Sequence, residues 1–242
     1  MKKIFIIIPA YNEDENVVDL LSSIKNIKLI FDKKVILVDD GSTDKTKELA
    51  MNFKNQMDLE ILVHAKNLGV PRTFFDGITA ACVNAEDDDI VLIMEADNTS
   101  KLSLMPEMIE KINLGSDIVI GSRYIAGGSY KNFPLYRTIG SNVVNSIVKL
   151  LVHLPNVTDY SIFYRAYRAE ILKKALAFYG NNFITTNSFA ANLEILLKLR
   201  KFVKKIDECP LVYNYGLKKG KSKMNLIKTL KEYGMVINKF KK

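Results

Sequence analysis

The sequence is poor in the residues that build disulfide-rich or zinc-binding proteins. Among 242 residues it has only two cysteines, Cys82 and Cys209, and two histidines, His64 and His153. The four are too far apart for a disulfide framework or for the short spacing of zinc ligands. We therefore interpret both histidines as structural and both cysteines as buried thiols, which suits a reducing cytoplasm.

Long apolar segments and phosphate-binding glycine loops are missing too. No window reaches about 18 uninterrupted apolar residues, so no transmembrane helix is predicted. Polar residues follow the first apolar run, Ile4–Ile8, at once, so this run indicates a strand and not a signal peptide. The sequence contains neither a G-x-G-x-x-G motif nor a Walker motif, and it therefore supports neither a dinucleotide-binding fold nor a P-loop enzyme.

The charge is unevenly distributed along the chain. Residues 198–242 carry 14 Lys and Arg against 3 Asp and Glu, a net charge of +11, whereas residues 1–197 carry a net charge of −3. Such a basic segment favours phosphates of lipid, nucleotide or nucleic acid, although a solvated basic helix is the alternative. We expect no nucleic-acid partner, because the positive charge is confined to this segment and no base-stacking motif accompanies it.

The first 122 residues alternate short apolar runs with helical patterns. The predicted strands are Ile4–Ile8, Val35–Val38, Glu60–His64, Ile90–Met94 and Asp117–Ile120. The predicted helices are Glu15–Lys28, Thr43–Asn55, Arg72–Asn84 and Leu104–Asn113. This alternation is typical of an α/β fold, with a mostly parallel central sheet and helices on both of its faces.

The pattern changes beyond residue 122. The segment GSRYIAGGSYKNFP is rich in glycine and aromatic residues and predicts a loop. Further helices are expected at about 138–152, 168–179 and 188–199 and from about 225, with a strand near 202–206 and a loop through 209–221. With no internal repeat and no low-complexity linker, we predict one domain, residues 1–223, followed by a basic amphipathic helix, residues 224–242.

Acidic residues collect where the predicted strands end. The acids are Glu13 after the first strand, Asp39, Asp40 and Asp44 after the second, and Glu95 and Asp97 after the fourth. Arg123 follows the fifth strand. Ligands bind beyond the carboxyl ends of parallel strands, where carboxylates accept hydrogen bonds from bases or sugars, or share a divalent cation that bridges a diphosphate. A turn with a helix N-cap is the alternative for residues 39–44.

Six segments identify a family resemblance. They are PAYNEDENV, VDDGSTD, EAD, GSRY, DYSIFYRAYR and GKSK, in that order between residue 4 and about residue 223. In order and spacing they resemble the family-2 glycosyltransferases with the GT-A fold, and most of all the dolichol- and polyprenyl-phosphate mannose synthase-like enzymes. The resemblance implies transfer of a hexose, with inversion, from a nucleotide-diphosphate sugar of the GDP-mannose or UDP-glucose type to a polyprenyl phosphate.

The resemblance also implies roles for individual residues. The expected nucleotide-sugar-binding residues are Pro9, Tyr11, Glu13, Val38, Asp40, Glu95, Ala96, Asp97, Arg123 and Lys223. Among them Glu95 and Asp97 are expected to hold Mg²⁺ or Mn²⁺. The expected catalytic residues are Asp97, Arg123, Asp159 and Lys223. The expected acceptor-binding residues are Tyr124, Arg137, Arg165 and Glu194.

The chain departs from the family pattern at four positions. Glu95 replaces the first metal-binding Asp, Thr99 a frequent Gln, Phe163 a Gly, and Leu217 an Arg, with Lys218 and Lys219 beside it. These changes leave open which sugar is transferred and which residues contact the acceptor. Two alternatives therefore stay open: a glycosyltransferase with a saccharide acceptor in surface polysaccharide synthesis, and a non-catalytic, membrane-docking relative with a decayed site.

The C-terminal segment has the pattern of an interfacial helix on anionic lipid. Its apolar positions are Leu226, Ile227, Leu230, Tyr233, Ile237 and Phe240, and its lysines at 228, 231, 239, 241 and 242 lie elsewhere around the helix. The alternative is a helix that packs on its own domain. A membrane-bound acceptor implies a peripheral protein on the cytoplasmic face, held by this helix or by a partner subunit that supplies a membrane anchor.

Overall fold

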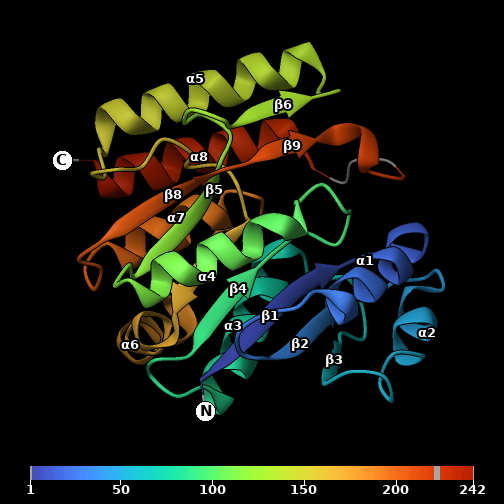
Figure 1. Ribbon diagram of the computed structural model, residues 1–242. Coiled ribbons are helices and arrows are strands. Elements are labelled where there is room, and N and C mark those ends of the chain that lie inside the picture. Colours follow the sequence, from blue (N-terminus) through green and yellow to red (C-terminus); the bar gives the residue numbers. More distant parts are fainter. Residues whose placement is uncertain (1, 221–223, 242) are drawn as a thin grey trace.

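A seven-stranded sheet forms the centre of the computed structural model, which describes residues 2–220 and 224–241 (Figure 1). Its strand order is β3-β2-β1-β4-β7-β5-β8. These strands are β1 (Lys3–Ala10), β2 (Asp32–Asp39), β3 (Leu59–Val63), β4 (Ile90–Ile93), β5 (Ile118–Ser122), β7 (Arg165–Arg168) and β8 (Ile206–Pro210). A second small sheet pairs β6 (Ser129–Lys131) with β9 (Val212–Asn214) in parallel.

Eight α-helices are described around the two sheets. They are α1 (Asp14–Asn26), α2 (Thr46–Met51), α3 (Val70–Asn84), α4 (Met105–Asn113), α5 (Leu135–Leu151), α6 (Ala169–Tyr179), α7 (Ala191–Leu199) and α8 (Leu226–Phe240). Helices cover both faces of the central sheet (Figure 1). The predicted α/β class with a mostly parallel sheet is therefore confirmed.

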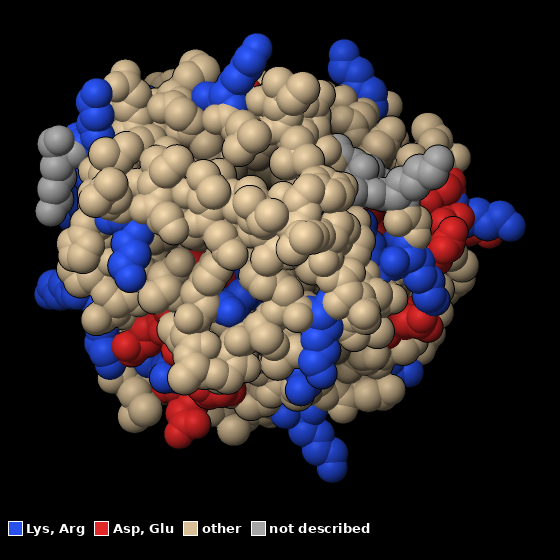
Figure 2. Space-filling view, turned by 90° about the horizontal axis from the view of Figure 1, so that it is seen from above, with Lys and Arg blue, Asp and Glu red and all other residues tan. Residues whose placement is uncertain are grey.

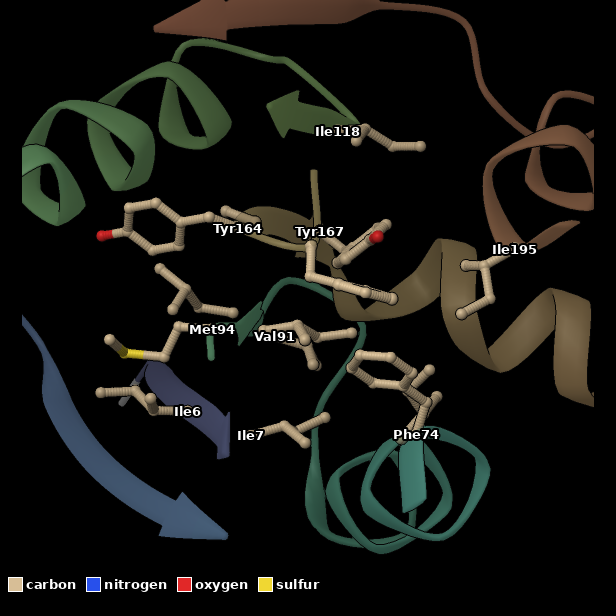
Figure 3. Packing of buried hydrophobic residues seen from close by; sticks show 14 of the residues in the cluster. Ile6, Ile7, Phe74, Val91, Met94, Ile118, Tyr164, Tyr167 and Ile195 are labelled. Carbon is tan, nitrogen blue, oxygen red and sulfur yellow. The ribbon is translucent and has the colours of Figure 1, made fainter. Parts of the chain in front are cut away.

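The central strands are apolar throughout because both of their faces are buried. Ile6 and Ile7 of β1 are fully buried and, as neighbours in a strand, point to opposite faces (Figure 3). Ile7 faces α3, which approaches closely because residue 77 is a glycine. A Cβ atom at Gly77 would lie 2.6 Å from Cγ2 of Ile7. The helix is thereby held tightly against β1 and β2, whose carboxyl ends carry the acidic motifs.

Three predictions for the second half of the chain are wrong, and one strand was not predicted at all. Strand β7 was not predicted, yet it lies between β4 and β5 and pairs antiparallel with both. The segment expected to be a loop after residue 121 contains β6, and the loop expected at 209–221 contains the end of β8 and all of β9. The strand expected near 202–206 begins only at Ile206. Short strands that pair with distant segments leave little local signal.

Helix α8 packs on the rest of the domain through one face. Thr229, Tyr233, Val236 and Ile237 are buried, whereas Ile227 and Met235 are exposed. The Glu232 carboxylate accepts hydrogen bonds from the backbone and side chain of residues 187–188, which precede α7. Residue 223, where we place the domain boundary, lies outside the described residues, so this boundary stays a prediction. Within the described part of the chain no helix combines the length and apolar character needed to cross a bilayer.

Candidate functional site

A cavity of about 920 Å³ lies at the carboxyl ends of β1, β2 and β4. Its polar end is lined by residues that follow these strands and β5. Eight of the ten expected nucleotide-sugar-binding residues lie on its wall: Pro9, Tyr11, Glu13, Asp40, Glu95, Ala96, Asp97 and Arg123. Val38 is instead buried in β2 beneath α3, and Lys223 lies outside the described residues. The structure thus brings the strand-end motifs together at one place.

Glu95 and Asp97 form an electrostatically strained pair in this polar end. Burial and the neighbouring Asp97 carboxylate raise the pKa of Glu95 to about 8. Asp97 accepts hydrogen bonds of 2.5 Å from the hydroxyl of Thr99 and from Nζ of Lys218. Lys218 comes from the segment after β9, so a residue distant in sequence brings positive charge to the pair. A further cation beside these carboxylates would relieve their repulsion.

The donor set suits a hard divalent cation that also binds a substrate. Among residues 2–220 and 224–241, no cluster of three or more His, Cys, Asp and Glu side chains could enclose a metal ion. Mg²⁺ commonly binds through one or two carboxylates and takes its other ligands from water and substrate phosphates. Glu95 and Asp97 fit this arrangement, with Lys218 as a competitor for Asp97.

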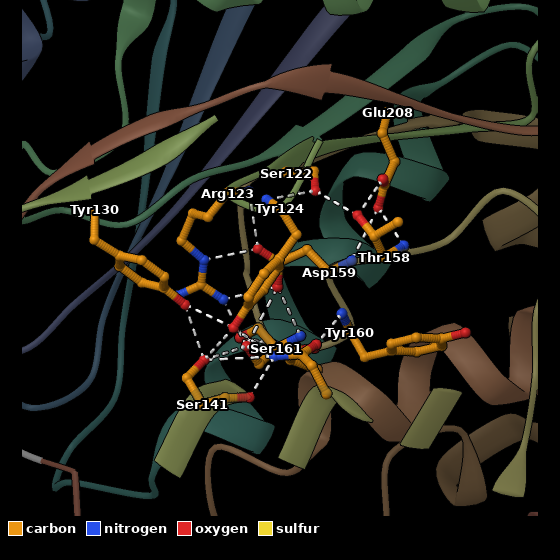
Figure 4. Close-up of polar contacts among 12 residues, drawn as sticks. Ser122, Arg123, Tyr124, Tyr130, Ser141, Thr158, Asp159, Tyr160, Ser161 and Glu208 are labelled. Carbon is orange, nitrogen blue, oxygen red and sulfur yellow. Dashed lines mark hydrogen bonds and ion pairs between the residues drawn. The ribbon is translucent and has the colours of Figure 1, made fainter. Parts of the chain in front are cut away.

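Arg123 is held by a buried ion pair with Asp159 (Figure 4). Its Nε and Nη2 atoms each donate a 2.7 Å hydrogen bond to Asp159, and Nη2 also donates to Ser161 at 2.6 Å. Burial alone would raise the pKa of Asp159, but Arg123 and the hydrogen bonds outweigh burial and lower it. Asp159 is fully buried and is not part of the cavity wall. The geometry makes it a residue that orients Arg123.

Only one of the four expected acceptor residues, Arg137 on α5, lies on the cavity wall. The hydroxyl of Tyr124 instead contacts Tyr130, Ser141 and Asn145 behind Arg123. The guanidinium of Arg165 is buried and donates to the backbone and side chain of Asn192.

Glu194 is likewise buried away from the cavity. Its carboxylate accepts hydrogen bonds from Thr185 and Thr186 and pairs with Lys198 at 2.5 Å. The motif positions of Arg165 and Glu194 matched the family, but a sequence match does not say whether a charged side chain faces a ligand or the protein interior.

The sequence interpretation missed the apolar end of the cavity. This end is lined by Phe133, Val144, Phe163, Phe189, Tyr215, Leu226, Leu230 and Tyr233. The rings of Phe163 and Phe74 stack at 4.5 Å, and Phe189 meets Phe163 edge-on. In the sequence these residues resemble ordinary core positions, and only the fold shows that α5, α8 and the segments around Phe163, Phe189 and Tyr215 line one cavity.

Comparison with protein families and curated sequences gives consistent results. The sequence profile described as Glycosyl transferase family 2 matches residues 5–176. The dolichol-phosphate mannosyltransferase of Pyrococcus furiosus is 31% identical over 236 residues, covering 96% of this chain and 61% of the relative. The polyprenol monophosphomannose synthase of Mycolicibacterium smegmatis is 26% identical over 175 residues, covering 72% of this chain and 64% of the relative. The chain therefore spans less than two thirds of the length of these two relatives.

Two solved structures of the same fold illustrate the likeness. The glucosyl-3-phosphoglycerate synthase of Mycobacterium tuberculosis, in complex with Mn²⁺, UDP and glucosyl-3-phosphoglycerate, superimposes with a TM-score of 0.65 at 14% identity, covering 98% of this chain and 76% of that one. The S. aureus TarS structure gives a TM-score of 0.58 at 20% identity, covering 86% and 58%. At these identities the likeness concerns the fold, and it confirms the expected GT-A architecture.

Proposed function

The chain belongs to glycosyl transferase family 2, and from this premise we propose that it transfers a hexose from a nucleotide-diphosphate sugar to a polyprenyl phosphate. One observation carries the proposal: a single cavity joins an acidic and basic end at the strand tips to an apolar end between α5 and α8. A polar donor and a phosphate on an apolar chain require these two environments side by side. The names of the two curated relatives also support a polyprenyl-type acceptor.

The polar end suits the donor. In our proposal Tyr11, Glu13 and Asp40 bind the nucleoside of a GDP-mannose or UDP-glucose type sugar. Glu95 and Asp97 would hold Mg²⁺ or Mn²⁺, which supplies positive charge to a departing diphosphate when it is bound. The Mn²⁺ and UDP bound by the M. tuberculosis protein of the same fold are consistent with that choice.

Arg137 on the cavity wall suits a phosphate acceptor. Arg123 is already engaged by Asp159, whereas Arg137 packs against aromatic rings, with its guanidinium 5.7 Å from the ring of Tyr215 and 5.9 Å from that of Tyr136. We assign Arg137 to the acceptor phosphate. A phosphate is ionised near neutral pH, so it needs positioning more than a strong general base, and an in-line attack on the anomeric carbon then gives inversion.

An exposed apolar stripe on α5 supports a membrane location for the acceptor. Leu135, Ile139, Val143 and Ile147, four residues apart along one side of the helix, are 74%, 55%, 51% and 43% exposed. Leu150 is 82% exposed. Figure 2 shows this face of the molecule with most Lys and Arg side chains around its margin. Exposed apolar patches of this kind mark interaction surfaces.

From this stripe we propose peripheral attachment to the cytoplasmic face of an anionic membrane. The basic margin would meet the lipid headgroups while α5 enters the interface. A membrane-anchoring partner subunit would strengthen this attachment. Helix α8 contributes less than its sequence suggested, because Tyr233 and Ile237 are buried within the protein.

Titration calorimetry with GDP, UDP and their sugars, in Mn²⁺ and then in chelator, tests the donor half of the proposal. We expect metal-dependent binding of one nucleotide class. Transfer is then assayed to a polyprenyl phosphate in liposomes and to soluble saccharides. Transfer to the lipid supports the proposal, whereas transfer only to saccharides points to polysaccharide synthesis. Binding of no nucleotide under either condition contradicts an active glycosyltransferase and favours the decayed relative.

A further inference from the structure

His64, first interpreted as an isolated structural residue, contacts the carboxylate that we assign to the nucleoside. Its Nδ1 atom lies 2.7 Å from Oδ1 of Asp40, and its Nε2 atom lies 3.0 Å from Oδ2 of Asp76 on α3. The His64 side chain is 9% exposed and that of Asp40 is 5% exposed. Asp76 is itself held by Nε of Arg72 at 2.6 Å. The imidazole therefore bridges α3 and the end of β2.

Asp40 in turn organises the turn that precedes α3. The backbone N–H groups of Leu68 and Gly69 donate 2.8 Å hydrogen bonds to Oδ1 and Oδ2 of Asp40. Residues 67–70 line the polar end of the cavity together with Asp40. At Gly41 a Cβ atom would lie 2.5 Å from the carbonyl carbon of Lys66, so the turn sits directly on the end of β2.

We propose that His64 is a positioning residue for nucleotide binding: by holding Asp40 it fixes both this carboxylate and the turn at residues 67–70 that forms the wall of the nucleoside site. The inference rests on the proposed function, since it assumes that this end of the cavity binds a nucleoside. It assigns a role to each ring nitrogen. Nδ1 orients Asp40, and Nε2 anchors the ring to Asp76.

Two amide substitutions separate these roles. The side-chain nitrogen of asparagine takes about the place of the histidine Nδ1, and that of glutamine about the place of Nε2. His64→Asn keeps a donor toward Asp40, whereas His64→Gln keeps one toward Asp76 and loses the contact with Asp40. If the residue served packing alone, glutamine would be the better replacement because its size is closer to that of histidine.

The test is calorimetric titration of the full chain and both variants with the nucleoside diphosphate that the unmodified chain binds, in Mn²⁺. We expect His64→Gln to raise the Kd for the nucleotide about tenfold, as for loss of a hydrogen bond to a charged group. The Kd of His64→Asn should stay within about threefold of that of the unmodified chain. Titration with Mn²⁺ and pyrophosphate, which lacks a nucleoside, should give equal Kd values for all three proteins. Equal nucleotide affinity in the two variants, or an equal loss for pyrophosphate, overturns the inference.

Hydrogen exchange at the Leu68 and Gly69 amides gives a second measurement that needs no nucleotide. We expect faster exchange at both amides in His64→Gln than in His64→Asn, while amides of β1 exchange alike. Unchanged exchange in His64→Gln overturns the positioning role even if nucleotide binding is confirmed. If the unmodified chain binds no nucleotide, the proposed function fails, and the role of His64 in nucleotide binding fails with it. Hydrogen exchange at the Leu68 and Gly69 amides would still show whether His64 holds the turn.

Discussion

The two ends of the cavity are built in different ways. At the polar end, short sequence motifs directly after β1, β2, β4 and β5 supply the side chains, and the topology of the sheet brings them together. At the apolar end, α5 and α8 both line the cavity although they are far apart in the sequence, and one outer side of α5 is left exposed. The polar end is fixed by buried ion pairs and hydrogen bonds. The exposed outer side of α5, next to the apolar end, suits a partner outside the chain.

The largest effect is expected from breaking the buried pair of Arg123 and Asp159. Asp159→Asn leaves a buried guanidinium without its counter-charge, which typically costs about 3–5 kcal/mol of the free energy of unfolding. Urea unfolding at pH 7 measures this loss. A loss below about 1 kcal/mol would show that the polar end does not depend on the pair.

The same ion pair predicts that the stability of the protein depends on pH. The pKa of Asp159 is lower in the folded protein than its ordinary value of about 3.9, so its stabilisation is present above that value and is lost as pH falls through the folded pKa. The stability difference between the unmodified chain and Asp159→Asn should therefore shrink below about pH 4. A difference that stays constant down to pH 2.5 would contradict this account.

Substituting Asp97 tests the chemistry of the polar end. Asp97→Asn removes a charge that we assign to the metal and leaves Lys218 without its partner. We expect kcat to fall by about 10²–10³, as for loss of one electrostatic contact to a developing charge. The control is Asp88→Asn, an exposed acid outside the cavity wall, which should leave kcat unchanged. Equal rates for the two variants would remove Asp97 from the catalytic site.

A charge placed on the exposed α5 stripe tests the proposed membrane contact separately. Ile139→Glu should weaken binding to anionic vesicles about tenfold, because one apolar side chain no longer enters the interface, and nucleotide affinity should stay unchanged. The matched control is Leu114→Glu, which is also exposed but follows α4. Vesicle sedimentation measures the difference. Identical binding of both variants would mean that another surface contacts the membrane.

The smallest effect expected here concerns whether the two sides of the central sheet unfold together, which the two cysteines can test. Burial raises the pKa of Cys82 and of Cys209 to about 12, so neither thiol should react at pH 8 in the native protein. Cys82 lies on α3, which packs against β1 and β2, and Cys209 lies on β8, at one edge of the central sheet. In increasing urea, Cys82→Ala and Cys209→Ala variants should become labelled at the same midpoint. Distinct midpoints would divide the molecule into two units.

The fold was predictable where local pattern and burial agree. The uninterrupted apolar runs of β1 and β4 indicate strands buried on both faces, and their positions were predicted to within a few residues. Strand β7 was not predictable in this way. Its sequence, RAYR, places arginines at both ends, and it becomes a strand because β4 and β5 pair with it from both sides.

The candidate site, like the fold, could be predicted only in part from the sequence. Acids at strand ends converge for topological reasons, so the common location of Asp40, Glu95 and Asp97 on the cavity wall could be predicted from the sequence. The direction of a side chain is set by tertiary packing, which explains why Arg165 and Glu194 matched a motif and yet lie buried behind the cavity. Lys218 reaches Asp97 only because the segment after β9 folds back over the strand tips.

The position of β7 also has a consequence for synthesis of the chain. When the ribosome has made β1 to β5, the hydrogen-bonding edges of β4 and β5 that β7 will occupy are still open, since Ile90 pairs with Arg168 and Ile120 with Arg165. Open edges of apolar strands invite pairing with other chains. The nascent chain therefore passes through an interval, between residues 122 and 168, in which these edges benefit from protection by a chaperone.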